Sequence, residues 1–112
     1  MHTPTFSPGD VVVVPFPFTD RAAAKRRPAL VCSAAEFNAN SRHLVLAMIT
    51  SSLHRAWPGD VIIDDLNAAG LPAASLVRWK LFTLDGSFVL RREGALAARD
   101  RAACREALPV AL

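Results

Sequence analysis

The chain has 112 residues, with 13 Lys and Arg against 10 Asp and Glu and a formal net charge of +3. This length fits a single domain over residues 1–112 that buries a core without disulfides or a structural metal. The mildly basic balance is compatible with a polyanionic partner. No apolar run approaches the roughly 18 residues of a membrane span, and the N-terminus lacks the pattern of a signal peptide. We therefore expect a cytoplasmic protein with no membrane partner.

Composition also bears on cofactors and assembly. Cys32 and Cys104 are far apart in the sequence and lie in apolar settings, so we expect two buried free thiols. No Cys/His cluster has zinc spacing, and the P-loop and Rossmann glycine patterns are absent, so we expect no metal and no cofactor. Hydrophobic residues make up 52% of the chain, which is at the upper end for globular proteins, and a dimer would use that surplus.

The N-terminal third predicts two strands joined by a loop. Residues 11–15 begin with a run of valines, which suits a strand that is buried on both faces or curled in a small barrel. The prolines within residues 15–17 forbid its continuation as part of a central ladder. Residues 16–25 therefore form a loop with turn residues such as Asp20, and a second apolar strand follows at residues 29–33.

The remainder of the chain predicts short strands and one final helix. A polar connection at residues 36–40 precedes strands at 43–50, 60–63, 75–79, 81–84 and 88–92. Loops are expected at 51–59, where Pro58-Gly59 is the turn, and at 67–72. Asp85 and Gly86 are a hairpin turn signal. Residues 97–108 have apolar positions at helical spacing, with Asp100 on the polar face. This order predicts a mainly β (α+β) protein, a small twisted barrel rather than a parallel α/β sheet.

Arg27 is the strongest candidate for a functional role. Pro28 favours an extended backbone at Arg27, and the strand that begins at Ala29 anchors it. A guanidinium held at the root of a strand suits recognition of a phosphate, with a solvated loop cation as the alternative. The neighbouring Lys25 and Arg26 fit solvation or the steering of phosphate better than catalysis.

Hydroxyl groups end the third predicted strand at Thr50, Ser51 and Ser52, where they can donate hydrogen bonds to a phosphoryl oxygen. The alternative is that they cap a turn, as Ser and Thr often do at strand ends. No nucleophile-elbow motif surrounds them, which argues against a hydrolase triad.

Aromatic and basic residues occur together in the second half of the chain. Arg78 and Trp79 are neighbours on a predicted strand, where a ring can stack on an unpaired base while the arginine contacts the backbone. The alternative places Trp79 in the core or in a dimer face. Trp57 lies in a loop and is either a lid residue or a plug. His54 is a candidate acid or base, with simple exposure as the alternative.

Five segments occur in the order seen in one protein family, at residues 9–20, 25–33, 48–52, 69–72 and 77–85, and the last helix follows them. Over residues 8–108 the chain thereby resembles the MazF/PemK family of ribosome-independent mRNA-cleaving toxins. The resemblance implies a small SH3-like β-barrel with a C-terminal helix, the MazF/CcdB-like fold, commonly assembled as a homodimer.

The resemblance also implies an activity and partners. Family members are the toxin components of type II toxin–antitoxin systems and cleave single-stranded RNA at a short sequence without a metal. The substrate 2′-hydroxyl attacks the adjacent phosphorus, which leaves a 2′,3′-cyclic phosphate and a 5′-hydroxyl end. A cognate antitoxin protein covers the RNA groove, and the toxin–antitoxin complex binds DNA. The expected enzyme is therefore an endoribonuclease, an mRNA interferase.

Carried over residue by residue, the resemblance makes Arg27 and Thr50 catalytic. The residues expected to bind RNA are Lys25, Arg26, Ser51, Arg78, Trp79, Asp20 and His54. One position departs from some relatives, in which an aspartate two residues after the equivalent of Arg78 is a candidate general base. Lys80 stands there in this chain, so that His54 or Asp20 takes over this role or the chain lacks it.

Two other functions remain open. A CcdB-like toxin would have the related barrel and bind DNA gyrase without cleaving RNA, although residues 109–112 lack the Trp-Gly-Ile-like tripeptide expected of that branch. A degenerate homologue would bind the antitoxin without cutting RNA, and Lys80 keeps this alternative open.

Overall fold

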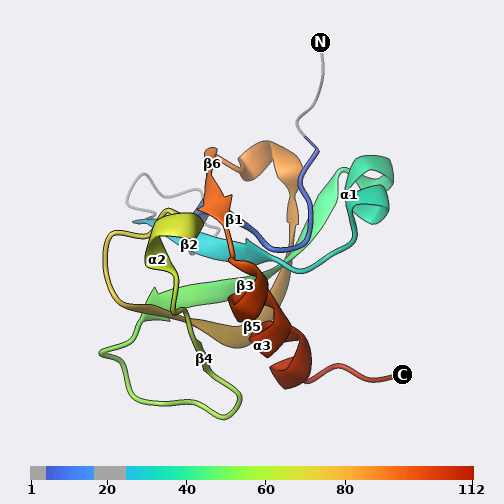
Figure 1. Cartoon of the computed structure of the whole chain (residues 1–112). Helices are drawn as coiled ribbons and strands as arrows, with labels where there is room; N and C mark the ends of the chain where they lie inside the picture. The colour runs from blue at the N-terminus through green and yellow to red at the C-terminus, as the bar shows by residue number, and fades with distance from the viewer. Residues whose placement is uncertain (1–4, 17–24) are drawn as a thin grey trace.

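The computed structural model describes residues 5–16 and 25–112. Its elements follow in the order β1 (Asp10–Phe16), β2 (Lys25–Val31), α1 (Ala35–Ser41), β3 (His43–Ser51), β4 (Val61–Ile62), α2 (Leu66–Ala69), β5 (Ser75–Asp85), the 3-10 turn η1 (Gly86–Phe88), β6 (Arg91–Ala95) and α3 (Ala98–Ala107). The strands form one antiparallel sheet in the order β4-β5-β3-β2-β1-β6, which curls into a half-open barrel (Figure 1). The predicted mainly β barrel with a C-terminal helix is confirmed. No helix among the described residues is long and apolar enough to span a membrane.

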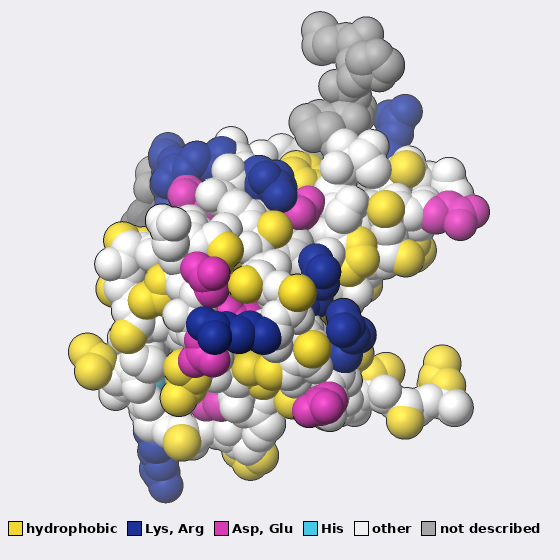
Figure 2. Space-filling model, viewed as in Figure 1, with side chains coloured by type: hydrophobic (Ala, Val, Ile, Leu, Met, Phe, Trp, Pro, Cys, Tyr) yellow, Lys and Arg dark blue, Asp and Glu magenta, His cyan; other side chains and the backbone are white. Residues whose placement is uncertain are grey.

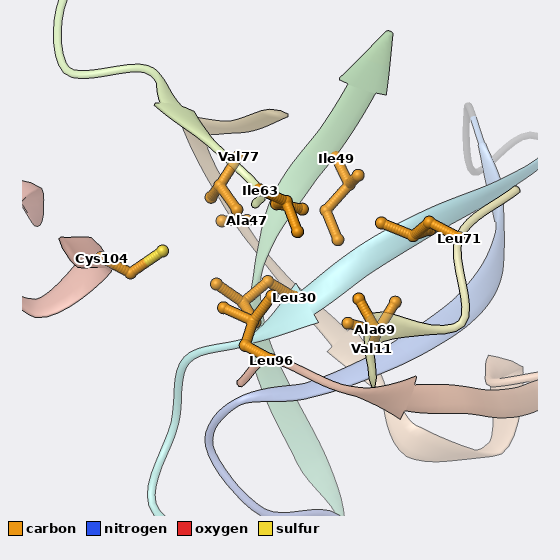
Figure 3. Close-up of a cluster of buried hydrophobic side chains, with 10 residues drawn as sticks. All are labelled: Val11, Leu30, Ala47, Ile49, Ile63, Ala69, Leu71, Val77, Leu96 and Cys104. Carbon is orange, nitrogen blue, oxygen red and sulfur yellow. The ribbon is translucent and has the colours of Figure 1, made fainter. Parts of the chain in front are cut away.

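One hydrophobic core joins the curled sheet to α2 and α3. Its buried members are Val11, Leu30, Ala47, Ile49, Ile63, Ala69, Leu71, Val77, Leu96 and Cys104. Figure 3 shows the side chain of Cys104 reaching from α3 toward this cluster. Both cysteines are free, and Cys104 is buried as predicted, whereas Cys32 is only half-buried at the edge of the cluster.

A second hydrophobic cluster lies on the opposite face of the sheet, because successive side chains of a strand point to opposite faces. Its buried members are Val12, Val14, Ala29, Val31, Leu44, Leu46 and Leu84, with Phe6, Phe82 and Val89 packed against it. Neighbouring valines of β1 therefore serve both clusters. The prediction that β1 is a strand buried on both faces is confirmed.

The polar connection predicted at residues 36–40 is wrong, because these residues lie in α1. Asn38 is only 6% exposed, and its side-chain amide donates to the carbonyls of Phe6 at 2.9 Å and Ser33 at 3.0 Å. These bonds satisfy the buried amide only after the N-terminal segment has packed beside α1. The break predicted at residues 67–72 likewise begins inside a short helix, α2.

The hairpin predicted after Asp85 is also wrong. The Asp85 carboxylate accepts a hydrogen bond from the backbone N–H of Ser87 at 2.9 Å and caps η1. The chain then crosses to the open edge of β1, where β6 pairs with Asp10–Val13 and begins at Arg91, later than predicted. The returning strand pairs there because β5 already lies between β3 and β4 in the sheet.

The two strands predicted between residues 75 and 84 are one long strand, β5. Its register with β3 shifts between Ala47 and Met48, which leaves Trp79 and Lys80 without a direct partner on β3. Such a bulge bends a strand and increases its twist. It therefore lets β5 follow the curvature of the sheet at the position where two of the candidate residues lie.

Asp100 does not lie on the exposed face of α3, contrary to prediction. Its side chain is 2% exposed, and its carboxylate accepts hydrogen bonds from the backbone N–H groups of Asp64 at 3.1 Å and Asp65 at 2.9 Å. A buried carboxylate is tolerated when both oxygens are hydrogen-bonded. Asp100 thereby joins α3 to the segment that leads into α2.

Candidate nucleic-acid interface

Arg27 lies within β2, whereas the sequence predicted it at the root of a strand. The loop predicted over residues 16–25 is wrong at both ends, because Phe16 and Lys25 pair with each other in β1 and β2. The strand begins at Lys25, and Arg27 pairs with Val14 of β1. The Arg27 side chain is half-buried, and no ion pair or hydrogen bond joins it to another residue in the described part of the chain. The sheet therefore fixes the backbone of Arg27, while its guanidinium has no polar partner among the described residues.

Thr50 lies on the same side of the sheet as Arg27, one strand away. β2 and β3 pair with Ala29 opposite Met48; Arg27 lies two residues before Ala29 and Thr50 two residues after Met48, so each shares the face of that paired residue. Side chains directly opposite each other in an antiparallel pair share a face of the sheet. Arg27 and Thr50 therefore belong to one face, which we call the site face.

Arg78 joins the site face from β5. It pairs with Met48, while Leu76 pairs with Thr50. Arg78 is therefore the diagonal neighbour of Thr50, and such neighbours are about 7–8 Å apart. Three adjacent strands, β2, β3 and β5, each contribute one of the residues Arg27, Thr50 and Arg78 to the same face.

Arg78 is held by an ion pair with Asp60. Its Nε donates to Asp60 Oδ1 at 3.1 Å and its Nη2 to Oδ2 at 2.8 Å, and Nη2 also donates to the carbonyl of Arg55 at 2.6 Å. The hydrogen bonds from Arg78 hold the pKa of the Asp60 carboxyl below its ordinary value of 3.8. The charge of Arg78 is thus balanced, and its fork of donors is directed at the loop between β3 and β4.

The other two cations of β2 divide between the faces. Because side chains alternate along a strand, Lys25 lies on the site face with Arg27, and Arg26 lies on the opposite face. Both side chains are exposed. Lys25 is therefore the β2 cation that stands beside Arg27.

The polar candidates close to Thr50 in the sequence do not join it. Ser51 faces the opposite side of β3, and its hydroxyl accepts a hydrogen bond from the backbone N–H of Leu53 at 3.2 Å, which is the turn-capping alternative. His54 is exposed in the same loop, and its backbone N–H donates to the carbonyl of Ser51 at 3.2 Å. Asp20 lies outside the described residues.

Trp79 is separated from Arg78 even though the two are adjacent in sequence. Its indole N–H donates to the carbonyl of Gly59 at 2.7 Å, and its ring packs against the first core cluster and lines a small cleft beneath α3 with Cys104. This is the core alternative of the prediction. A base bound on the site face would not meet Trp79.

The sequence analysis did not find Asp60 as the partner of Arg78 and left Trp57 undecided. The backbone N–H of Asp60 donates to the carbonyl of Trp57 at 3.1 Å, and Gly59 has φ of +82°. This is the turn that a Pro-Gly pair favours, because glycine readily adopts positive φ. The Pro58-Gly59 signal was visible in the sequence, but the residues that the turn brings together were not.

Positive charge is unevenly distributed over the surface. Figure 2 shows Lys and Arg side chains gathered at the upper left of the view, near the ends of β2 and β6 in Figure 1, while cations and carboxylates alternate over the front. Within residues 5–16 and 25–112, no three His, Cys, Asp or Glu side chains come together as a metal site. The site face offers a ligand cationic groups and a hydroxyl.

A family model described as the PemK-like, MazF-like toxin of type II toxin–antitoxin systems matches residues 7–112. The chain belongs to this family. The matched range includes all three strands of the site face and confirms the resemblance seen in the sequence. A search of curated protein sequences gave no match for this PemK/MazF family member.

Solved structures of MazF toxins have the same fold. A MazE–MazF complex from Deinococcus radiodurans has a TM-score of 0.73 at 24% identity and covers 93% of this chain and 92% of that chain. The Mycobacterium tuberculosis toxin MazF-mt6 has a TM-score of 0.72 at 22% identity, with coverages of 88% and 91%. An endoribonuclease in complex with its cognate antitoxin, from a mycobacterial species, has a TM-score of 0.72 at 16% identity, with coverages of 97% and 100%.

Proposed function

We propose that this PemK/MazF family member is an endoribonuclease toxin, an mRNA interferase that cleaves single-stranded RNA at a short sequence without a metal ion. The observation that carries the proposal is the pair of Arg27 and Thr50, a guanidinium and a hydroxyl on the same face of adjoining strands. A guanidinium forms charge-assisted hydrogen bonds with phosphate oxygens, often two in parallel, and a hydroxyl adds a further donor.

In the proposed reaction, the 2′-oxygen of one nucleotide bonds to the adjacent phosphorus, and the bond from that phosphorus to the 5′-oxygen of the next nucleotide breaks. The 2′-hydroxyl proton leaves to a base, and the departing 5′-oxygen takes up a proton. The products are a 2′,3′-cyclic phosphate and a 5′-hydroxyl end. Negative charge gathers on the phosphoryl oxygens in the transition state, and fixed donors stabilise that charge more than they stabilise the ground state. Arg27 and Thr50 are the donors in this proposal.

The other candidates on the site face bind RNA in this proposal rather than react with it. Lys25 is exposed next to Arg27 and attracts the phosphate backbone. Arg78, which Asp60 holds in place, forms the part of the site face next to the loop between β3 and β4. Arg26 and Trp79 face away from Thr50, so we no longer include them among the RNA-binding residues.

We extend the proposal to partners: a homodimer bound by a cognate antitoxin. Similar structures include a MazE–MazF complex and an endoribonuclease with its cognate antitoxin. Phe37, Phe88 and Leu90 remain 46%, 53% and 47% exposed, and exposed apolar side chains offer surface for protein partners. An antitoxin segment over Arg27 and Thr50 would keep RNA from the site face.

The test is incubation of the purified protein with a long mixed-sequence RNA in EDTA, followed by mapping of the 5′ ends. We expect discrete cuts at one short sequence, with 5′-hydroxyl ends. Arg27→Ala and Thr50→Ala should each lower the cleavage rate by about 100-fold or more, because each removes a transition-state donor. Arg26→Ala is the matched control, since Arg26 is the adjacent exposed cation on the opposite face, and it should cut at close to the parent rate.

Three results would contradict parts of the proposal. Normal cutting by Arg27→Ala would show that Arg27 takes no part in the reaction. Cutting that requires an added divalent metal would contradict the metal-independent route. No cutting under either condition would refute the nuclease, and a gyrase supercoiling assay would then test the CcdB-like alternative.

A further inference from the structure

An exposed indole stands beside the site face. Trp57 is 43% exposed, although tryptophan is highly buried on average. Arg78 Cζ lies 5.7 Å and Lys80 Nζ 5.0 Å from the centroid of its ring. Because both cations come from the same strand, β5, the ring lies over that strand while a large part of it stays open to solvent.

The position of Trp57 is fixed before any ligand binds. Its backbone N–H donates to Asp60 Oδ2 at 2.8 Å, and the Asp60 N–H returns a bond to the Trp57 carbonyl at 3.1 Å. The same Asp60 carboxylate binds Arg78, which also donates to the carbonyl of Arg55. A side chain that is ordered in advance loses less conformational entropy on binding. The loop therefore presents a preorganised ring.

The ring also lies close to the proposed reaction. β3 runs from Thr50 directly into the loop that carries Trp57, and Arg78, beneath the ring, is the diagonal neighbour of Thr50. Lys80 and Arg55 are exposed cations at the same place. Proteins that bind single-stranded nucleic acid combine cations that track the backbone with aromatic rings on which bases stack.

We propose that Trp57 is a stacking platform for one unpaired base of the RNA and a determinant of the cleavage sequence. This inference rests on the proposed function, because its ligand is the proposed substrate. Arg78, Lys80 and Asp60 position the ring, and the cations also attract the neighbouring phosphates. A base next to the cleaved bond stacks on the exposed indole. The simpler alternative is that the indole only packs against Arg78 and Lys80 and holds the loop in place. That alternative predicts no effect of Trp57 on RNA binding.

The first experiment measures binding without cleavage. In a Trp79→Phe variant Trp57 is the remaining indole, and its fluorescence is followed while 2′-O-methylated oligoadenylate or oligouridylate of about ten nucleotides is added at low salt. The 2′-O-methyl group blocks cleavage. We expect the single strands to quench the emission, and the duplex of the two strands, whose bases are already stacked, to quench it little.

Affinity then separates stacking from packing. Trp57→Ala should bind the single strands roughly 5- to 150-fold more weakly, the loss expected for one base–aromatic stack, whereas Trp57→Phe should keep most of the affinity. Leu53→Ala is the matched control, because Leu53 is a 94% exposed apolar residue of the same loop, and it should bind like the parent. Unquenched Trp57 emission together with full affinity of Trp57→Ala would overturn the proposal, and the fluorescence result decides even if Trp57→Ala folds poorly.

A second experiment tests the sequence preference. Mapped cuts in mixed-sequence RNA should show that Trp57→Ala relaxes the preference for the base at one position beside the cut. Cleavage with an unchanged site preference and unchanged oligonucleotide affinity would overturn the platform and leave the nuclease intact. Binding through Trp57 without any cleavage would instead overturn the nuclease and leave the platform intact.

Discussion

At the scale of single residues, the roles of the site-face cations depend on which of them are already paired. Arg78 binds Asp60 with both a 2.8 Å and a 3.1 Å hydrogen bond, whereas Arg27 has no ion pair within the described part of the chain. A guanidinium that already binds a carboxylate is committed to holding structure. For this reason we propose Arg27 rather than Arg78 as the cation that binds the phosphate, while Arg78 holds the Trp57 loop through Asp60.

The first prediction concerns the acid sensitivity of this loop. Because Arg78 lowers the pKa of Asp60 below 3.8, the ion pair is fully present above pH of about 4 and is lost as the pH falls through the lowered pKa. In a Trp79→Phe background, the Trp57 emission should stay constant from neutral pH to about 4 and shift below it. Asp60→Asn should show the shifted emission already at neutral pH. If Asp60→Asn kept the same acid transition, a carboxylate other than Asp60 would be responsible for the shift in Trp57 emission.

At the scale of elements, α3 is fastened to the sheet by an apolar and a polar contact. Cys104 enters the first core cluster, and Asp100, one helical turn earlier, accepts hydrogen bonds from the N–H groups of Asp64 and Asp65. Residues four apart lie on the same side of a helix. The helix therefore turns one mixed face inward, and a count of apolar residues alone would place Asp100 outside.

The second prediction follows from this contact. Asp100→Ala should lower the free energy of unfolding by about 2–4 kcal/mol, because hydrogen bonds to charged groups are the stronger ones and their donors would be left without a partner. Chemical denaturation measures the loss. Arg99→Ala is the control, since Arg99 is the exposed neighbour on α3, and it should change stability by no more than about 0.5 kcal/mol. Equal stability of the two variants would show that solvent replaces Asp100.

At the scale of the whole molecule, folding brings together two thiols that are distant in sequence. Cys32, just after β2, and Cys104, on α3, line the same small cleft. Burial, with a smaller contribution from Cys104, raises the pKa of Cys32 to about 12, and burial raises the pKa of Cys104 to about 11. Both thiols therefore stay protonated in the native protein under conditions where the unfolded chain would begin to ionise them.

The third prediction is a loss of stability at alkaline pH. Since both native pKa values lie above the ordinary value of 9.0, the stabilisation is complete below pH 9 and is lost as the pH rises toward 11, by up to about 1.4 kcal/mol per pH unit for each thiol. Denaturation curves from pH 8 to about 11 measure this slope. A variant with Cys32→Ala and Cys104→Ala should show a shallower slope, and an equal slope would attribute the effect to other groups.

Local patterns were enough for the parts of the fold that depend on residues close together in the chain. The valines of β1, the turn at Pro58-Gly59 and the final helix all carry their signal within a few residues, whereas the break expected at Pro15 is wrong because Pro15 and Phe16 still pair with β2. The same is true of the family, because its segments keep their order along the chain. Arg27 and Thr50 could be selected from the sequence as candidates in this way.

The amino-acid sequence alone thus determined a mainly β barrel and its family, and it singled out Arg27 and Thr50 as the leading candidates for the site. Only the tertiary structure decided that β6 closes on β1, that Asn38 and Asp100 are buried, and that Trp79 faces the core. Each of these depends on a partner far away along the chain, which no local pattern reveals. The face on which Arg27, Thr50 and Arg78 meet is likewise a consequence of strand register, because a shift of one residue would send each side chain to the other side of the sheet.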